Sequence, residues 1–257
     1  MKLLQLALSA FLIIPTLSIS ADEARYIHII VALADNESQG IVPIPKLIGN
    51  GDDPRNNLYW GALYGFKTQF KKNKNWKLLN TKKKLSEHIL EQVLFYNKKH
   101  NTYLIGDAYK GSSIKEATQQ FLIATSSSQS EALTFKGKNI KTYGQADLIG
   151  YVGHNGLMDF NIKKEAIPVA KKGNNDAIIL ACQSKLFFTN WLTYTGANSL
   201  LLTTGNMAPE AYTLEAALEA WMKKKPNSQI KESAAKAYNK YQKTGIKGAR
   251  RLFFTQE

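Results

Sequence analysis

The chain contains a single cysteine, Cys182, and a histidine, His154, that each come at the end of a hydrophobic segment. His154 directly follows Asp147–Gly153 (DLIGYVG), and Cys182 closes Asp176–Cys182 (DAIILAC). A cysteine thiol becomes a nucleophile when a histidine takes or holds its proton and later returns that proton to the leaving group. These residue types therefore predict a cysteine hydrolase, with Cys182 as the nucleophile and His154 as the acid and base.

Five apolar segments are expected to form the sheet that positions these two residues. Continuous apolar runs, in contrast to alternating ones, indicate a parallel sheet that is covered on both faces. The predicted strands are Tyr26–Ala34, Thr102–Gly106, Asp147–Gly153, Asp176–Cys182 and Ser199–Thr204.

Helical patterns separate these strands. The predicted helices are one from about Leu58, one over Lys82–Asn97, one opened by a capping box of Ser113 and Glu116, one from Ser184, one after Pro209 and one over Ser228–Lys243. Strands that alternate with helices indicate an α/β fold, and we expect a three-layer, open, mostly parallel sheet flanked by helices.

Sites in such sheets gather at the carboxyl ends of the strands. Neighbouring strands lie about 4.8 Å apart, so His154 and Cys182 can meet across a substrate if their strands are adjacent. The helix from Ser184 is expected to begin beside Cys182, where its positive end stabilises a thiolate. The backbone N–H groups of Cys182 and Gly156 are the predicted oxyanion hole.

The order of these two motifs resembles that of the caspase/gingipain/legumain superfamily of cysteine peptidases. In that superfamily a histidine motif and then an Ala-Cys motif each follow a hydrophobic block, and the resemblance in strand order covers about Tyr26 to Met222. It implies that His154 is the catalytic histidine, Gly156 the oxyanion-hole glycine and Cys182 the nucleophile, with a peptide or protein as substrate. The superfamily has glycine directly after the histidine, whereas this chain has Asn155.

Acidic residues near the site select a basic substrate side chain in the resembled family. Asp35 and Asp107, near predicted strand ends, are therefore candidates for substrate binding through bidentate arginine contacts, or else they only cap turns. The segment Gly49–Asn57 leaves the same edge and carries Asp53 and Arg55. We expect it to cover the site and to contribute these two residues to substrate binding, or alternatively to form a turn that caps the next helix.

The same residues also allow a function without catalysis. A free cysteine at the end of a core strand is often packed and inert, and together with Asn155 this leaves open a non-catalytic exported binding module on the same fold. An α/β-hydrolase fits less well, because Leu180–Ser184 lacks both glycines of the G-x-[S/C]-x-G motif. No cofactor is predicted, and no metal either, since neither His-x-x-x-His nor paired cysteines occur.

The first 21 residues are predicted to be a signal peptide. Lys2 precedes an apolar stretch over Leu3–Leu17, and small residues up to Ala21 offer a cleavage site. No later segment reaches the roughly 18 continuous apolar residues of a membrane span, so no transmembrane anchor is expected in the mature chain. We expect residues 22–257 to form one caspase-like α/β domain that is periplasmic or secreted.

The formal net charge of +14 comes from lysines scattered in small groups along the chain. Such scatter is typical of solvated helix faces and loop tips, whereas a nucleic-acid site concentrates basic and aromatic residues on one element. No specific nucleic-acid partner is therefore expected. Association with anionic envelope surfaces is compatible with this charge.

Overall fold

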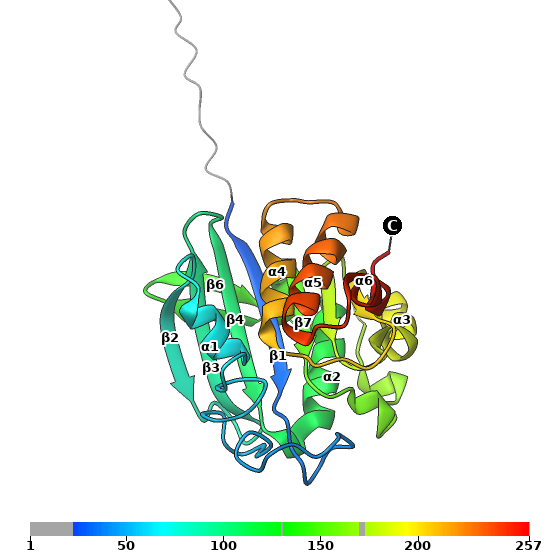
Figure 1. The fold of residues 1–257 in the computed structure, drawn as a ribbon. Helices are drawn as coiled ribbons and strands as arrows, with labels where there is room; N and C mark the ends of the chain where they lie inside the picture. The colour runs from blue at the N-terminus through cyan, green and yellow to red at the C-terminus, as the bar shows by residue number, and fades with distance from the viewer. Residues whose placement is uncertain (1–22, 130, 170–172, 257) are drawn as a thin grey trace, which may run out of the picture.

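A central sheet of eight strands organises the computed structural model, which describes residues 23–129, 131–169 and 173–256 (Figure 1). The strand order is β10-β9-β8-β7-β1-β4-β3-β2. The strands are β1 (Arg25–Ala32), β2 (Lys77–Lys83), β3 (Ile89–Asn97), β4 (Thr102–Tyr109), β7 (Leu148–Val152), β8 (Asp176–Leu180), β9 (Asn198–Thr203) and β10 (Phe253–Phe254). A separate hairpin pairs β5 (Glu131–Phe135) with β6 (Lys138–Thr142). The predicted signal peptide lies outside the described residues.

The sheet is mixed and mostly parallel. Strand β1 pairs in parallel with both β4 and β7, and the parallel pairing continues through β8 to β9. Strands β2, β3 and β10 extend the two edges by antiparallel pairing. The predicted α/β fold with a mostly parallel sheet is confirmed, and the antiparallel edges were not predicted.

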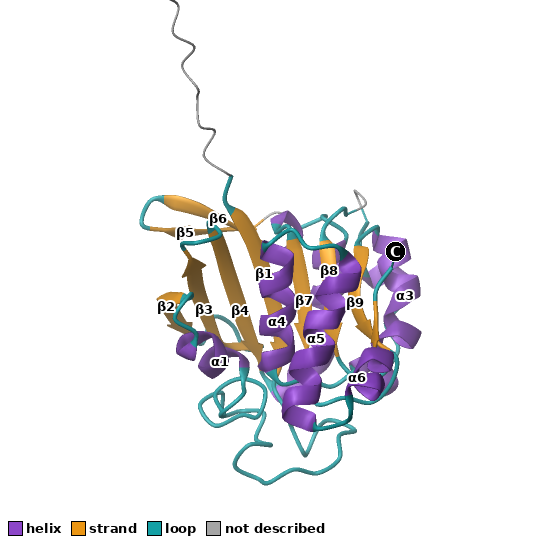
Figure 2. Cartoon of the chain, turned by 45° about the horizontal axis from the view of Figure 1, so that its top comes forward, coloured by secondary structure: helices purple, strands orange, loops and turns teal. Residues whose placement is uncertain are grey.

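Helices cover both faces of this sheet (Figure 2). The helices are α1 (Phe66–Lys72), α2 (Ile114–Thr125), α3 (Ser184–Thr195), α4 (Ala211–Met222), α5 (Asn227–Gln242) and α6 (Ile246–Leu252). Successive side chains of a strand point to opposite faces, so Ile27 and Ile29 of β1 pack in the core shared with α1, α4 and α5. Ile30 and Ala32 pack in the core shared with α2 and α3. The expected three layers are therefore present.

The prediction of a helix over Lys82–Asn97 is wrong, because this segment forms the end of β2, a turn and β3. The apolar spacing that suggested a helix also places Val93 and Phe95 on one face of a strand, and both are fully buried. Pairing of β3 with β4 along its length decides between the two patterns.

The helix predicted from about Leu58 begins only at Phe66, the first residue of α1. The preceding segment is a series of turns in which Gly61 lies against backbone carbonyls, since an added Cβ would come within 2.0 Å of Arg55 O. That close packing requires glycine and is incompatible with a regular helix there.

The remaining helices are confirmed with small shifts of their ends. Helix α2 begins directly after Ser113, but Ser113 makes no side-chain cap. Its hydroxyl is instead hydrogen-bonded to His88 Nδ1 at 3.0 Å. The second predicted strand extends three residues beyond Gly106, to Tyr109.

Candidate active site

His154 and Cys182 lie at the same edge of the sheet, on the loops that follow two neighbouring parallel strands. Val152 of β7 pairs with Leu180 of β8, and each reactive residue comes two positions after its paired residue. Both side chains line one cavity of about 390 Å³. The structure thus brings the two predicted catalytic residues to a common cleft.

Gly153 makes the turn that directs the chain from β7 to His154. Its φ of +144° and the distance of 2.6 Å between an added Cβ and Ala32 O leave no space for a side chain. Its N–H donates to Leu180 O at 3.3 Å, which continues the contact with β8 beyond the last strand pair. The start of the His154 loop is therefore fixed by backbone contacts.

The His154 ring is held by Asp159, a residue that the sequence did not single out. His154 Nε2 lies 2.7 Å from Asp159 Oδ2, and the histidine is almost fully buried. A short 3-10 helix, Gly156–Met158, returns the chain so that Asp159 faces the ring. Asp159 also accepts a hydrogen bond of 3.2 Å from the Gly40 N–H. This contact fixes the orientation of the His154 ring, as a carboxylate does beside a catalytic histidine.

The thiol of Cys182 is partly exposed and contacts the backbone of Met207. Its Sγ donates to Met207 O at 3.6 Å and accepts from the Met207 N–H at 3.4 Å. Among the described residues, no hydrogen bond joins Sγ to the His154 ring. Gln183 then adopts a left-handed conformation with a φ of 51°, and α3 begins at Ser184. As predicted, the positive end of a helix lies near the thiol.

Tyr59 also lines this cavity. Burial raises the pKa of Tyr59 well above its ordinary value, and the nearby Cys182 raises it further. The hydroxyl therefore stays protonated over the physiological range and is available as a hydrogen-bond donor.

Apolar side chains form most of the cleft wall: Ile41, Val42, Ile44, Leu58, Met158, Met207, Ala208 and Pro209. Glu210 is the one carboxylate among the described residues that line it. Its Oε2 accepts hydrogen bonds of 3.1 Å from both the Tyr212 hydroxyl and Gln242 Nε2. Burial raises the pKa of Glu210, and these two hydrogen bonds act in the opposite direction.

Gly156, the predicted oxyanion-hole residue, does not line the cleft. It is buried at the start of the 3-10 helix, where an added Cβ would lie 2.5 Å from the Phe160 ring and 3.0 Å from Thr118 Oγ1. Asp35 also lies outside the lining of the cleft. Its carboxylate accepts hydrogen bonds from the Glu37 N–H and the Ser38 hydroxyl, which is the turn-capping arrangement.

Asp107 is fully buried inside β4 and not at a strand end. Its carboxylate accepts from Gln92 Nε2 at 2.8 Å, from the Tyr143 hydroxyl at 2.9 Å and from His28 Nε2 at 2.9 Å. His28 Nδ1 accepts from the Tyr143 N–H at 2.8 Å, which leaves the ring proton on Nε2. This network satisfies the charge of Asp107 inside the protein, away from the cleft.

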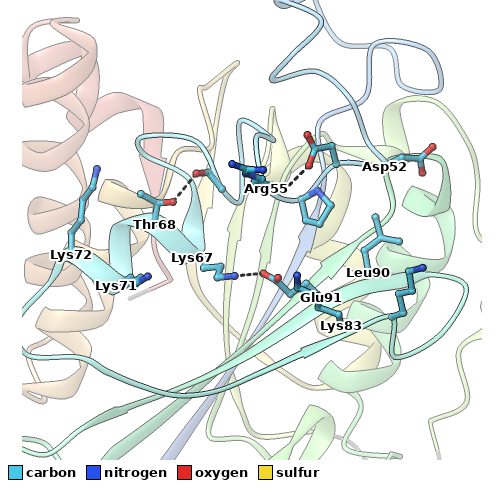
Figure 3. Close-up of a pocket in the computed structure, with 13 residues that line it drawn as sticks. Asp52, Arg55, Lys67, Thr68, Lys71, Lys72, Lys83, Leu90 and Glu91 are labelled. Carbon is cyan, nitrogen blue, oxygen red and sulfur yellow. Dashed lines mark hydrogen bonds and ion pairs between the residues drawn. The ribbon is translucent and has the colours of Figure 1, made fainter.

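Asp53 and Arg55 are brought together, but at a different place. They line a second cavity, of about 730 Å³, between the segment before α1 and strands β2 and β3 (Figure 3). No residue of Gly49–Asn57 lines the cleft of Cys182, although Leu58 and Tyr59, which follow this segment, do. Asp53 and Arg55 are therefore not part of that cleft.

Two further observations concern the described residues as a whole. No three His, Cys, Asp or Glu side chains in them converge in a way that would hold a metal ion. Within the same part of the chain, no helix is both long enough and apolar enough to cross a membrane.

Comparison with known proteins gives no match to any family model, curated protein or solved structure.

Proposed function

We propose that this chain is an exported cysteine peptidase of the caspase-like type, with Cys182 as nucleophile and His154 as general base and acid. The observation that carries this proposal is the common cleft, which holds the only cysteine of the chain and a histidine whose ring is oriented by a carboxylate. The resemblance in motif order supports the family, and the character of residues 1–21 supports export.

The proposed reaction starts with transfer of the Cys182 thiol proton to His154. Sγ then attacks the carbonyl carbon of a peptide bond, and the C–N bond breaks as His154 returns the proton to the leaving amine. Water, deprotonated by His154, hydrolyses the thioester and regenerates the thiol. Asp159 orients the ring and stabilises its protonated form.

The developing oxyanion needs hydrogen-bond donors in the cleft. We assign the backbone N–H of Cys182, the donor expected from the sequence, as the first. We assign the Tyr59 hydroxyl as the second, because it lines the same cavity and burial keeps it protonated. Gly156 is not assigned, since it is packed beneath Phe160.

The cleft wall favours a substrate with a bulky apolar side chain next to the scissile bond. Its apolar residues come from four separate segments, and the side chains of Val42 and Met158 are exposed. Glu210 already accepts two hydrogen bonds, and burial disfavours its charged form, so it is poorly suited to bind a basic side chain.

A second candidate function is a non-catalytic binding module that uses the same cleft. The observation in its favour is that Cys182 Sγ makes its hydrogen bonds with the Met207 backbone and not with the His154 ring. Such a protein would bind apolar peptide segments and release them unchanged.

Peptide libraries, incubated with the wild type and with Cys182→Ala and read by mass spectrometry, distinguish these functions. The peptidase proposal predicts cleavage next to Leu, Met or Phe that is absent with Cys182→Ala. Binding of uncleaved apolar peptides by both proteins, with no new termini, would support the binding module and rule out the peptidase.

A further inference from the structure

The largest of the cavities described above lies away from Cys182 and is lined by many charged side chains. It measures about 730 Å³ and is bounded by the segment Asp52–Arg55, by α1 and by the β2–β3 turn with the start of β3. Figure 3 shows lysines of α1 on one side of this hollow and Lys83 of β2 on the other, with Arg55 above them. Six basic residues line it: Arg55, Lys67, Lys71, Lys72, Lys83 and Lys84.

One of these cations is neutralised inside the protein. Lys67 Nζ lies 2.7 Å from Glu91 Oε1, and the same oxygen accepts a 2.7 Å hydrogen bond from Trp60 Nε1. Glu91 is almost fully buried, and its negative charge compensates the positive charge of Lys67. Asp52, a second carboxylate of the lining, forms an ion pair of 3.2 Å with Lys110.

The other five cations remain uncompensated. Across the described residues, none of them has a carboxylate oxygen within 4.0 Å. The third carboxylate of the lining, Asp53, accepts hydrogen bonds from the Arg55 N–H at 3.0 Å and from Asn56 Nδ2 at 2.7 Å. Five positive charges line this cavity together with one carboxylate that is outside any ion pair, Asp53, and they produce a focused positive potential.

We propose that this cavity is a binding site for an anionic ligand that carries at least two phosphate groups. Two phosphates are required because the uncompensated cations stand on separate walls, with Lys71 on α1 and Lys83 on β2. Arginine binds phosphate oxygens in a bidentate manner, and lysines bind them as point charges. The phosphates belong either to a free polyphosphate or to the headgroups of an anionic lipid. The proposal is independent of the reaction at Cys182.

Calorimetry with inorganic tripolyphosphate tests this site directly, using the full mature chain. The pocket variant is Lys71→Glu with Lys83→Glu. The control, Lys115→Glu with Lys247→Glu, carries the same change in net charge at exposed positions on α2 and α6. We expect tripolyphosphate to bind the wild type and the control equally, and the pocket variant at least about tenfold more weakly. Thermal unfolding of each protein without ligand verifies that the variants are folded.

A second arm uses vesicles of phosphatidylglycerol to identify the source of the phosphates. Vesicle binding that tripolyphosphate displaces and that the pocket variant loses assigns lipid headgroups, whereas binding of tripolyphosphate alone assigns a free ligand. The proposal is wrong if tripolyphosphate does not bind the wild type, or if the pocket and control variants lose affinity to the same extent.

Discussion

Asn155 Nδ2 donates a hydrogen bond of 2.7 Å to the backbone carbonyl oxygen of Cys182. The other end of the same amide, Oδ1, accepts from the Leu157 N–H at 3.1 Å and so caps the 3-10 helix that follows His154. Asn155 is fully buried. The residue that departs from the resembled motif therefore connects the loop of His154 to the loop of Cys182.

Replacement of Asn155 by alanine is expected to lower the free energy of unfolding by about 1–3 kcal/mol, because two part-buried hydrogen bonds, to the Cys182 carbonyl and from the Leu157 N–H, are lost. Urea denaturation measures this loss. Asn198→Ala is the matched control, since its exposed amide makes only long contacts of 3.3 and 3.4 Å, and it should change the free energy by less than about 0.5 kcal/mol. Equal losses in the two variants would show that the Asn155 bridge contributes nothing.

Asp159→Asn is expected to slow the alkylation of Cys182 at neutral pH while the fold persists. The carboxylate at 2.7 Å orients the ring, and the neutral amide of asparagine does not attract an imidazolium, so proton transfer from the thiol is less favoured. The rate of iodoacetamide labelling at neutral pH measures this loss. A rate identical to that of the wild type would show that Asp159 has no role in the candidate site.

Tyr59→Phe separates oxyanion stabilisation from thiol reactivity. Peptide cleavage should fall by about a hundredfold, which is typical of the loss of one oxyanion donor. Alkylation by iodoacetamide forms no oxyanion, so its rate should stay unchanged and serves as the internal control. If cleavage and alkylation fall together, Tyr59 acts on the position of Cys182 and not on the oxyanion.

Glu210→Gln is expected to change the pH dependence of stability. Burial raises the pKa of Glu210 in the folded protein, so its stabilising contribution is complete below the pKa of the unfolded carboxyl and is lost as the pH rises through the raised value. Glutamine resembles the protonated form and does not titrate. The variant should therefore gain stability relative to the wild type as the pH rises from about 4, near the pKa of an unfolded glutamate, through the raised pKa of the folded protein.

Denaturation at several pH values measures this difference, and Glu116→Gln, at an exposed position on α2, serves as the control with little pH dependence. A constant difference between the wild type and Glu210→Gln across this range would contradict the expected shift.

The sequence was sufficient to predict the parallel core and the two strands that end in the cleft, because long apolar runs such as Asp176–Leu180 identify buried strands. It was misleading at Ile89–Asn97, where a helical spacing of apolar residues coincides with burial of both faces of a strand. Pairing of this segment with the preceding strand β2 and the following strand β4 makes it a strand, and the spacing of apolar residues does not report that pairing.

Some residues of the candidate site could be predicted from the sequence, and others could not. Cys182 and His154 could be found because each follows a strand, whereas Asp159 faces His154 only through the short 3-10 helix between them. The apolar wall from Ile41 to Ile44 comes from a loop without periodicity, and nothing in the local sequence places it against the cleft. Long-range packing also determines that Asp107 is buried and not at a strand end.

The rate of Cys182 alkylation tests the central claim most directly, because the chain has one cysteine and every label reports on it. Iodoacetamide is applied at neutral pH to the wild type, to His154→Ala and to glutathione as a free-thiol reference. The account predicts that the wild type reacts at least about tenfold faster than the reference and that folded His154→Ala loses this advantage. A wild type that reacts no faster than glutathione, at the same rate as His154→Ala, would contradict the assignment of Cys182 as a nucleophile.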